Sequence, residues 1–225
     1  MSMLAPAMLI ARKDLKVEAR TKDVLTSVGL FGLLVVVAAS FSFPTTGEGR
    51  QGVAAGMLWM AFLFAALLGL GRSFALEKEE GCMEGLMASP APRESIFLGK
   101  LFANLIFTGL AEIAIIPISI MLLQLEPGNG VWLLLGVTAL GTLGLLTVGS
   151  LFAAMAVNTR TREAILPILV IPVAIPLLIA SVKATEVALL GKGIGDAMQW
   201  ILLLAFYTGT FLFVALFTFP YVLEE

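Results

Sequence analysis

The chain carries few residues that could do catalytic chemistry. It contains no histidine, the commonest general base and metal ligand and a frequent haem ligand in proteins. Cys82 is the only cysteine, which excludes an intrachain disulfide and a CxxC metal or redox motif. No GxxxxGK(S/T) sequence occurs, so the chain has no P-loop for ATP. We therefore expect no catalytic residue, no metal site and no directly bound cofactor.

The most polar segment runs from residue 72 to residue 100 and is rich in glutamate. Acidic residues contribute little to membrane orientation, so another role is expected for them. A short helix in this segment would be stopped by Ser89, Pro90 and Pro92. It could dock on a partner, with apolar side chains filling a cleft and acidic ones matching its charge. The alternative is a solvated connector. The predicted docking residues are Glu77, Glu79, Glu80, Gly81, Glu84, Leu86, Met87, Ser89 and Pro90.

A line of polar residues follows in the next apolar run. Asn104, Thr108 and Glu112 recur every four residues after Lys100, so they share one face of a helix. At about 1.5 Å per residue, Glu112 lies roughly 16 Å beyond Lys100, near the middle of a bilayer. An ionisable group at that depth is a functional-site hypothesis. A hydrogen-bonded glutamate that holds helices together fits the pattern equally well.

Residues 4–23 are predicted to form an amphipathic helix at the membrane interface. Apolar residues recur there at three- and four-residue spacing, and basic residues fall on roughly the opposite side. Such a helix lies in the interface with its basic side toward lipid headgroups. The alternative is a plain positively charged orientation signal. The apolar set is Leu4, Met8, Ala11, Leu15 and Ala19, and the basic set is Lys13, Lys16 and Arg20.

The elements that must position these residues are membrane spans. Hydrophobic residues make up 59% of the 225 and charged residues only 13%, too apolar for one water-soluble core. A spanning helix needs about 20 apolar residues, whereas spanning strands would alternate in runs of about 10, a pattern that is not seen. We predict an all-α polytopic protein of one domain, 1–225, with spans at 24–43, 53–71, 101–123, 131–157, 164–182 and 200–223. Residues 183–199 are predicted to include a short interfacial helix.

Two of the predicted spans have unusual compositions. The fifth contains Pro167, Pro172 and Pro176, which free backbone carbonyls that neighbouring helices must satisfy. The fourth contains several glycines, which permit close approach between helices. We interpret both as packing features, with a mobile helix as the alternative for the proline-rich span.

The distribution of basic residues predicts the orientation. With the N-terminus inside the cell, 11 of the 14 lysines and arginines fall on the cytoplasmic side. The positive-inside rule therefore places both termini in the cytoplasm. The net charge of −2, without a basic stripe outside the membrane-flanking segments, argues against nucleic acid as a partner.

Several segments together resemble a known family. They are residues 11–20, which contain Ala-Arg-Lys-Asp-Leu; 56–68 around Trp59; Glu80-Gly-Cys-Met-Glu84 with Ser89-Pro90; the proline-rich 162–179; and the terminal Tyr221-Val-Leu-Glu-Glu225. Six spans with an interfacial helix and a polar second connector resemble the permeases of ABC-2-type (type V) exporters. More narrowly, the chain is similar over its whole length to the haem exporter protein B family, the permease of the bacterial cytochrome c maturation system.

The resemblance implies the partners and the location. The connector would be a coupling helix that docks on a separate cytoplasmic ATPase, which binds the ATP. A haem-handling membrane subunit and a small membrane subunit would complete the complex, with this chain as a homodimer in the bacterial inner membrane. The alternatives are an ABC-2 exporter of lipid-linked or other amphiphilic substrates, a proton-coupled secondary transporter that uses Glu112, and a non-transporting scaffold.

Overall fold

The structure is a bundle of long helices with one helix lying across its end. The computed structural model describes residues 3–42, 49–79, 92–156 and 162–222, with the backbone alone for 23–24, 74–79 and 162–163. In this part of the chain there is no strand, and six helices are long and apolar enough to cross a membrane. The elements are α1 (Leu4–Thr21), α2 (Asp23–Ser42), α3 (Arg50–Glu79), α5 (Arg93–Leu122), η1 (Gly128–Gly130), α6 (Val131–Ala156), α7 (Arg162–Leu189) and α8 (Ile194–Val222).

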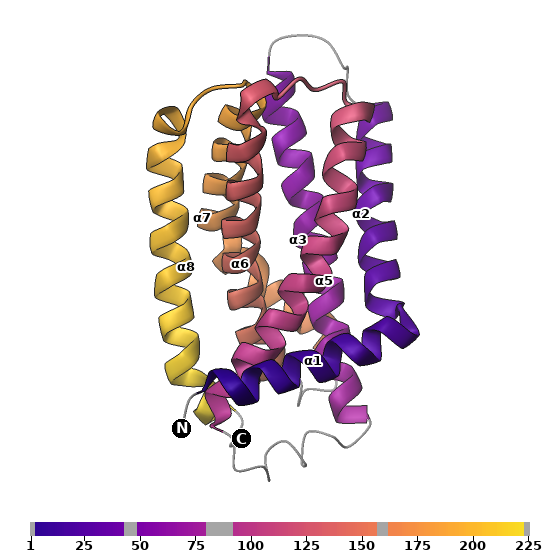
Figure 1. The fold of residues 1–225 in the computed structure, drawn as a ribbon, viewed down its shortest axis with the longest axis vertical. Helices are drawn as coiled ribbons and strands as arrows, with labels where there is room; N and C mark the ends of the chain where they lie inside the picture. Colours follow the sequence, from indigo (N-terminus) through magenta and orange to yellow (C-terminus); the bar gives the residue numbers. More distant parts are fainter. Residues whose placement is uncertain (1–2, 43–48, 80–91, 157–161, 223–225) are drawn as a thin grey trace.

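Helix α1 lies across the lower ends of the six upright helices (Figure 1). It ends at Lys22, whose backbone has a left-handed conformation with φ of 59°. The N–H of Lys22 donates to the carbonyl of Glu18 at 2.7 Å and closes the last turn. The chain then turns directly into α2. Both ends of the described chain lie at this lower end of the bundle.

Helix α6 packs closely against its neighbours because of its glycines. A Cβ added at Gly141 would come within 2.2 Å of the Trp59 ring on α3, and one at Gly144 within 2.3 Å of Leu177 on α7. The Trp59 indole N–H donates to the Thr185 hydroxyl of α7 at 2.9 Å, so it is satisfied without water. Gly141 and Gly144 therefore act in packing, as predicted, whereas Gly136 has open space around it.

The three prolines of the fifth span lie inside one continuous helix, α7. Pro176 cannot donate a backbone hydrogen bond to the preceding turn. In that turn the carbonyl of Val173 accepts a hydrogen bond from the Tyr207 hydroxyl of α8 at 2.6 Å. This hydrogen bond ties α8 to α7 one residue after Pro172, the residue whose carbonyl Pro176 leaves without a helical donor.

Several helices run further than the predicted spans. Helix α3 continues to Glu79 and α5 begins at Arg93, so both ends of the predicted connector 72–100 are helical. The separate interfacial helix predicted within 183–199 is wrong, because α7 continues to Leu189 and α8 begins at Ile194. Helix α7 continues past Lys183, whose ammonium pairs with Glu186 one turn later at 2.9 Å. The helix stops where Gly191 adopts a φ of 67°.

Candidate functional site

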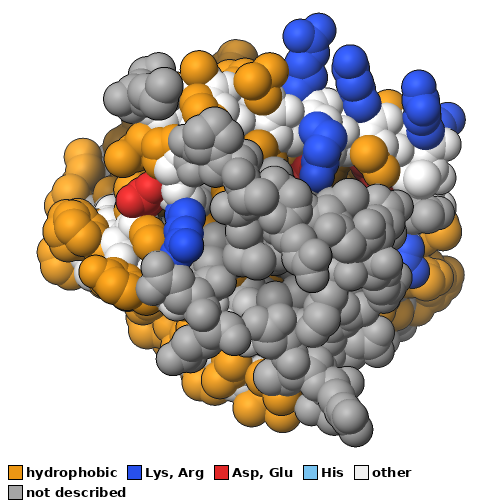
Figure 2. All heavy atoms as spheres, turned by 90° about the horizontal axis from the view of Figure 1, so that it is seen from below, with side chains coloured by type: hydrophobic (Ala, Val, Ile, Leu, Met, Phe, Trp, Pro, Cys, Tyr) orange, Lys and Arg blue, Asp and Glu red, His pale blue; other side chains and the backbone are white. Residues whose placement is uncertain are grey.

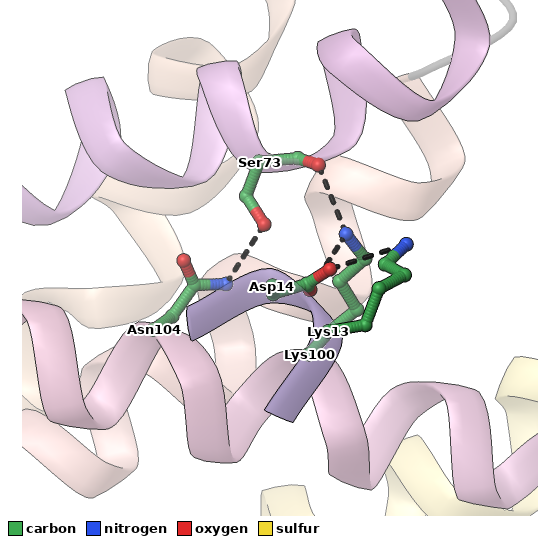
Figure 3. A network of polar contacts seen from close by, with 5 residues as sticks. All are labelled: Lys13, Asp14, Ser73, Lys100 and Asn104. Carbon is green, nitrogen blue, oxygen red and sulfur yellow. Dashed lines mark hydrogen bonds and ion pairs between the residues drawn. The ribbon is translucent and has the colours of Figure 1, made fainter. Parts of the chain in front are cut away.

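The candidate site is a buried polar junction where α1, α3 and α5 meet. At its centre is Lys100 of α5, whose side chain is 2% exposed. Its ammonium lies 3.0 Å from the Asp14 carboxylate of α1. The same ammonium donates to the backbone carbonyl of Ser73 on α3 at 3.1 Å. One lysine therefore joins three helices, as Figure 3 shows.

A second contact holds the same point of α3. One turn after Lys100, the amide of Asn104 donates to the Ser73 hydroxyl at 3.4 Å. Asp14 is shared as well, because the Lys13 ammonium lies 3.2 Å from its other oxygen (Figure 3). Ser73 is six residues from the end of α3, where the predicted docking segment begins. We call the end of α3 and the start of α5, which flank the docking segment, its two roots. The junction lies at the first of them.

The local sequence explains how α1 comes so close to α5. Gly99 precedes Lys100, and a Cβ there would lie 2.7 Å from the Cβ of Ile10 and 2.8 Å from the carbonyl of Ala7. The facing positions of α1 include Ala7 and Ala11, which are 0% and 1% exposed. Small residues on both helices permit the crossing that brings Asp14 to Lys100.

The face by which α1 contacts the bundle mixes small, apolar and acidic residues. Of the predicted apolar set, Ala11 is buried, whereas Leu4, Met8 and Ala19 are exposed, and Ala7, Ile10 and Glu18 are buried beside Ala11. Here the buried stripe contains two acids, and both have partners. Asp14 pairs with Lys100, and Glu18 accepts the backbone N–H of Leu25 at 2.7 Å, which satisfies a donor in the first turn of α2.

The basic residues of α1 lie away from the bundle. Lys13, Lys16 and Arg20 are exposed, as is Arg12. In the view from below, lysine and arginine side chains stand along one margin of the molecule (Figure 2). The helix therefore separates its charges, with acids toward the protein and bases outward.

The polar line of the third span is buried along its length. Asn104, Thr108 and Glu112 are 2%, 4% and 5% exposed, on the same helix face as Lys100. The carboxylate of Glu112 accepts a hydrogen bond from the Thr142 hydroxyl of α6 at 2.5 Å. This contact links α5 to α6 within the bundle, while the lower end of the line links α5 to α1 and α3.

The first turns of α5 also contact the end of α8. The Arg93 guanidinium donates to the carbonyl of Pro220 at 3.1 Å. The rings of Phe97 and Phe219 pack with their centroids 5.3 Å apart. The start of α5 is thus attached to α1, α3 and α8.

The predicted docking residues lie mostly outside the described residues. Glu77 and Glu79 belong to the last turns of α3, where only the backbone is described. The others fall in the gap after residue 79: Glu80, Gly81, Glu84, Leu86, Met87, Ser89 and Pro90. Within the described residues, no three histidine, cysteine, aspartate or glutamate side chains lie close enough together to hold a metal ion.

Sequence reasoning missed Lys100, Asp14 and Ser73 as a unit. The sequence places Lys100 among the cytoplasmic charges, as the last residue of the connector 72–100. One signal was present, since Lys100 begins the four-residue spacing that continues through Asn104. A lysine on the same face as a buried polar line is expected to be buried with it and to need an anionic partner.

Comparison with known proteins gives matches over most of the chain. The sequence model of the family described as CcmB protein matches residues 5–225. A protein of Paracoccus denitrificans called Heme exporter protein B is 32% identical over 196 residues, 87% of this chain and 88% of that protein. Proteins of the same name are 36% identical over 149 residues in Rhodobacter capsulatus (66% and 68% of the chains) and 29% over 197 in Pseudomonas aeruginosa (87% and 86%).

Proposed function

The chain belongs to the CcmB family, and on this premise we propose that it is the membrane permease subunit of a system for haem export and cytochrome c maturation. The observation that carries the proposal is the match of the family to residues 5–225. The six apolar helices agree with a permease. As a permease subunit the chain is not itself an enzyme.

The work would be driven by a separate cytoplasmic ATPase. The segment from Glu77 to Pro90 docks on that subunit and moves with it when nucleotide binds. A ligand can drive such a change only if its affinity differs between the two states of the complex. ATP is bound by the partner, and haem is handled by further membrane subunits, including a small one.

The junction at Lys100 supports this mechanism physically. A segment that is pulled by a motor transmits force only if its roots are fixed to the rest of the protein. Ser73 lies at one root and Arg93 near the other. The ammonium of Lys100 holds the first root to α5 and α1, and Arg93 holds the second to α8. Movement of the docking segment is therefore passed to four helices together.

The proposed location is the bacterial inner membrane, with both termini in the cytoplasm and the chain present as a homodimer. Supporting this orientation, α1 with its basic residues lies at the same end of the bundle as the roots of the docking segment (Figure 1). The positive-inside rule places that end in the cytoplasm.

The docking step is tested by reversing charge in the segment. We expect the Glu80→Lys/Glu84→Lys variant to lose the ATPase during co-purification, because like charges would face the docking site. The matched control is Glu126→Lys/Asp196→Lys, which makes the same charge change at two exposed residues at the opposite end of the bundle. The control should retain the ATPase. Unchanged co-purification of the first variant, with both proteins equally inserted in the membrane, contradicts the docking proposal.

A further inference from the structure

We propose that the outward side of α1 binds anionic phospholipid headgroups through Arg12, Lys16 and Arg20, called here the basic row. These three residues are exposed and follow one another at four-residue spacing. On a helix that spacing places them in one line, about 6 Å apart along the axis. A line of separate cations matches a row of separate headgroups. The proposal concerns the surrounding lipid and holds whatever the complex transports.

The charges of α1 are distributed so that the outward side has no acid to neutralise it. The two acidic residues of the helix, Asp14 and Glu18, are engaged on the protein side by Lys100 and by the N–H of Leu25. Lys13 is partly exposed and lies beside Asp14. In the described part of the chain no ion pair involves Arg12, Lys16 or Arg20. The donors of the basic row are therefore available to anions from outside the described chain.

The position of α1 places the basic row at headgroup depth. The helix lies across the bundle at the ends of the spans, as a helix in the plane of the interface does (Figure 1). Leu4, Met8 and Leu9 are 65%, 64% and 68% exposed on the same helix. At the membrane interface, such apolar residues contact the acyl chains and the cations beside them reach the phosphates. An acidic protein partner would leave these apolar side chains without a nonpolar environment.

The chemistry of the row favours phosphate. Arginine offers a planar fork of donors that binds phosphate oxygens in pairs, and two of the three residues are arginines. Each lysine or arginine near an anionic leaflet adds attraction worth about a fivefold change in local lipid occupancy. The row is therefore expected to concentrate anionic lipid beside α1.

The experiment measures which lipid lies next to α1 in the full chain. A fluorophore is attached at Ala5→Cys in a Cys82→Ser background, since Ala5 is exposed on α1. The protein is placed in nanodiscs of phosphatidylcholine with one quarter phosphatidylglycerol. Quenching is compared between spin-labelled phosphatidylglycerol and spin-labelled phosphatidylcholine at equal mole fraction. We expect severalfold stronger quenching by the anionic lipid, and near equality in 1 M NaCl, where the Debye length falls to about 3 Å.

The variants assign the preference to the basic row. Each of Arg12→Gln, Lys16→Gln and Arg20→Gln should reduce this preference in part, and the triple variant should abolish it. The control Lys192→Gln removes an exposed cation at the other end of the bundle and should leave it unchanged. Equal quenching by the two lipids in the unaltered protein overturns the proposal, as does a preference that survives in the triple variant. Lipid preference that appears only after Glu80 and Glu84 are neutralised also overturns it, since the row would then be occupied by the chain's own connector.

Discussion

The two partners of the Lys100–Asp14 pair differ in burial, so removing one should cost more than removing the other. The Lys100 side chain is 2% exposed and the Asp14 side chain 12% exposed, with 3.0 Å between the charged atoms. Asp14→Asn removes the carboxylate beside this buried ammonium and leaves its hydrogen bond to the carbonyl of Ser73. Removing one partner of a buried ion pair costs about 3–5 kcal/mol in free energy of unfolding.

The opposite change, Lys100→Met, removes the buried charge itself. Asp14 keeps Lys13 at 3.2 Å and a partly exposed position. The variant loses the ion pair with Asp14 and the hydrogen bond to Ser73. Together these losses should lower the free energy of unfolding by about 1–2 kcal/mol. The double variant should cost about the same as Lys100→Met alone. The two single changes then differ by about 2–3 kcal/mol, which is roughly 30–150-fold in the unfolding equilibrium.

The assay is equilibrium unfolding of the purified chain by sodium dodecyl sulfate in mixed micelles, followed by circular dichroism. The control pair is Lys183–Glu186, which has a similar distance of 2.9 Å but side chains 51% and 26% exposed. Lys183→Met and Glu186→Gln should each change the free energy of unfolding by less than about 1 kcal/mol, as exposed pairs do. If Asp14→Asn costs no more than Lys100→Met, the lysine is not held in the interior by this aspartate and the junction does not exist as described.

Three further predictions follow from single contacts. Gly99→Val should destabilise by about 2 kcal/mol or more in the same unfolding assay, because its side chain would enter α1, whereas Gly109→Ala, with open space around it, should be neutral or stabilising. Trp59→Phe should cost about 1 kcal/mol through the lost hydrogen bond to Thr185, measured against Phe64→Leu at a lipid-exposed position. Glu112→Gln keeps the hydrogen bond to α6 and should leave unfolding unchanged; full cytochrome c maturation in this variant would remove a proton-carrying role, and its loss would support one.

The spans could be predicted from the sequence because lipid imposes a length and a composition on each of them. Their ends could not, because a helix that leaves the hydrocarbon can continue in water. Helix α3 runs to Glu79 past Arg72, and α7 runs past Lys183. In both cases the predicted span ends at the first charge. Charge ends the apolar window but not the helix, since arginine, lysine and glutamate are good helix formers.

The contact face of α1 could not be predicted because it does not follow polarity. Asp14 and Glu18 face the protein, and Leu4 and Met8 face away from it. A periodicity argument assigns acids to water and leucine to the protein core. That argument fails here because Lys100 and the backbone N–H of Leu25 provide partners for the two acids. Leucine can also be exposed at no cost where the surrounding medium is lipid. The site could therefore not be predicted, because two segments that are far apart in the sequence supply each other's charge partners.

The contacts of α5 suggest how a local pull becomes a change across the membrane. Its first turns are fixed to α1, α3 and α8 by the contacts of Lys100 and Arg93. Its middle is joined to α6 by the hydrogen bond from Thr142 to Glu112 and by side-chain packing between the two helices. A force on the start of α5 is thus passed to the lower ends of α1, α3 and α8. Because α6 packs against α3, α5 and α8, we expect it to follow the same movement.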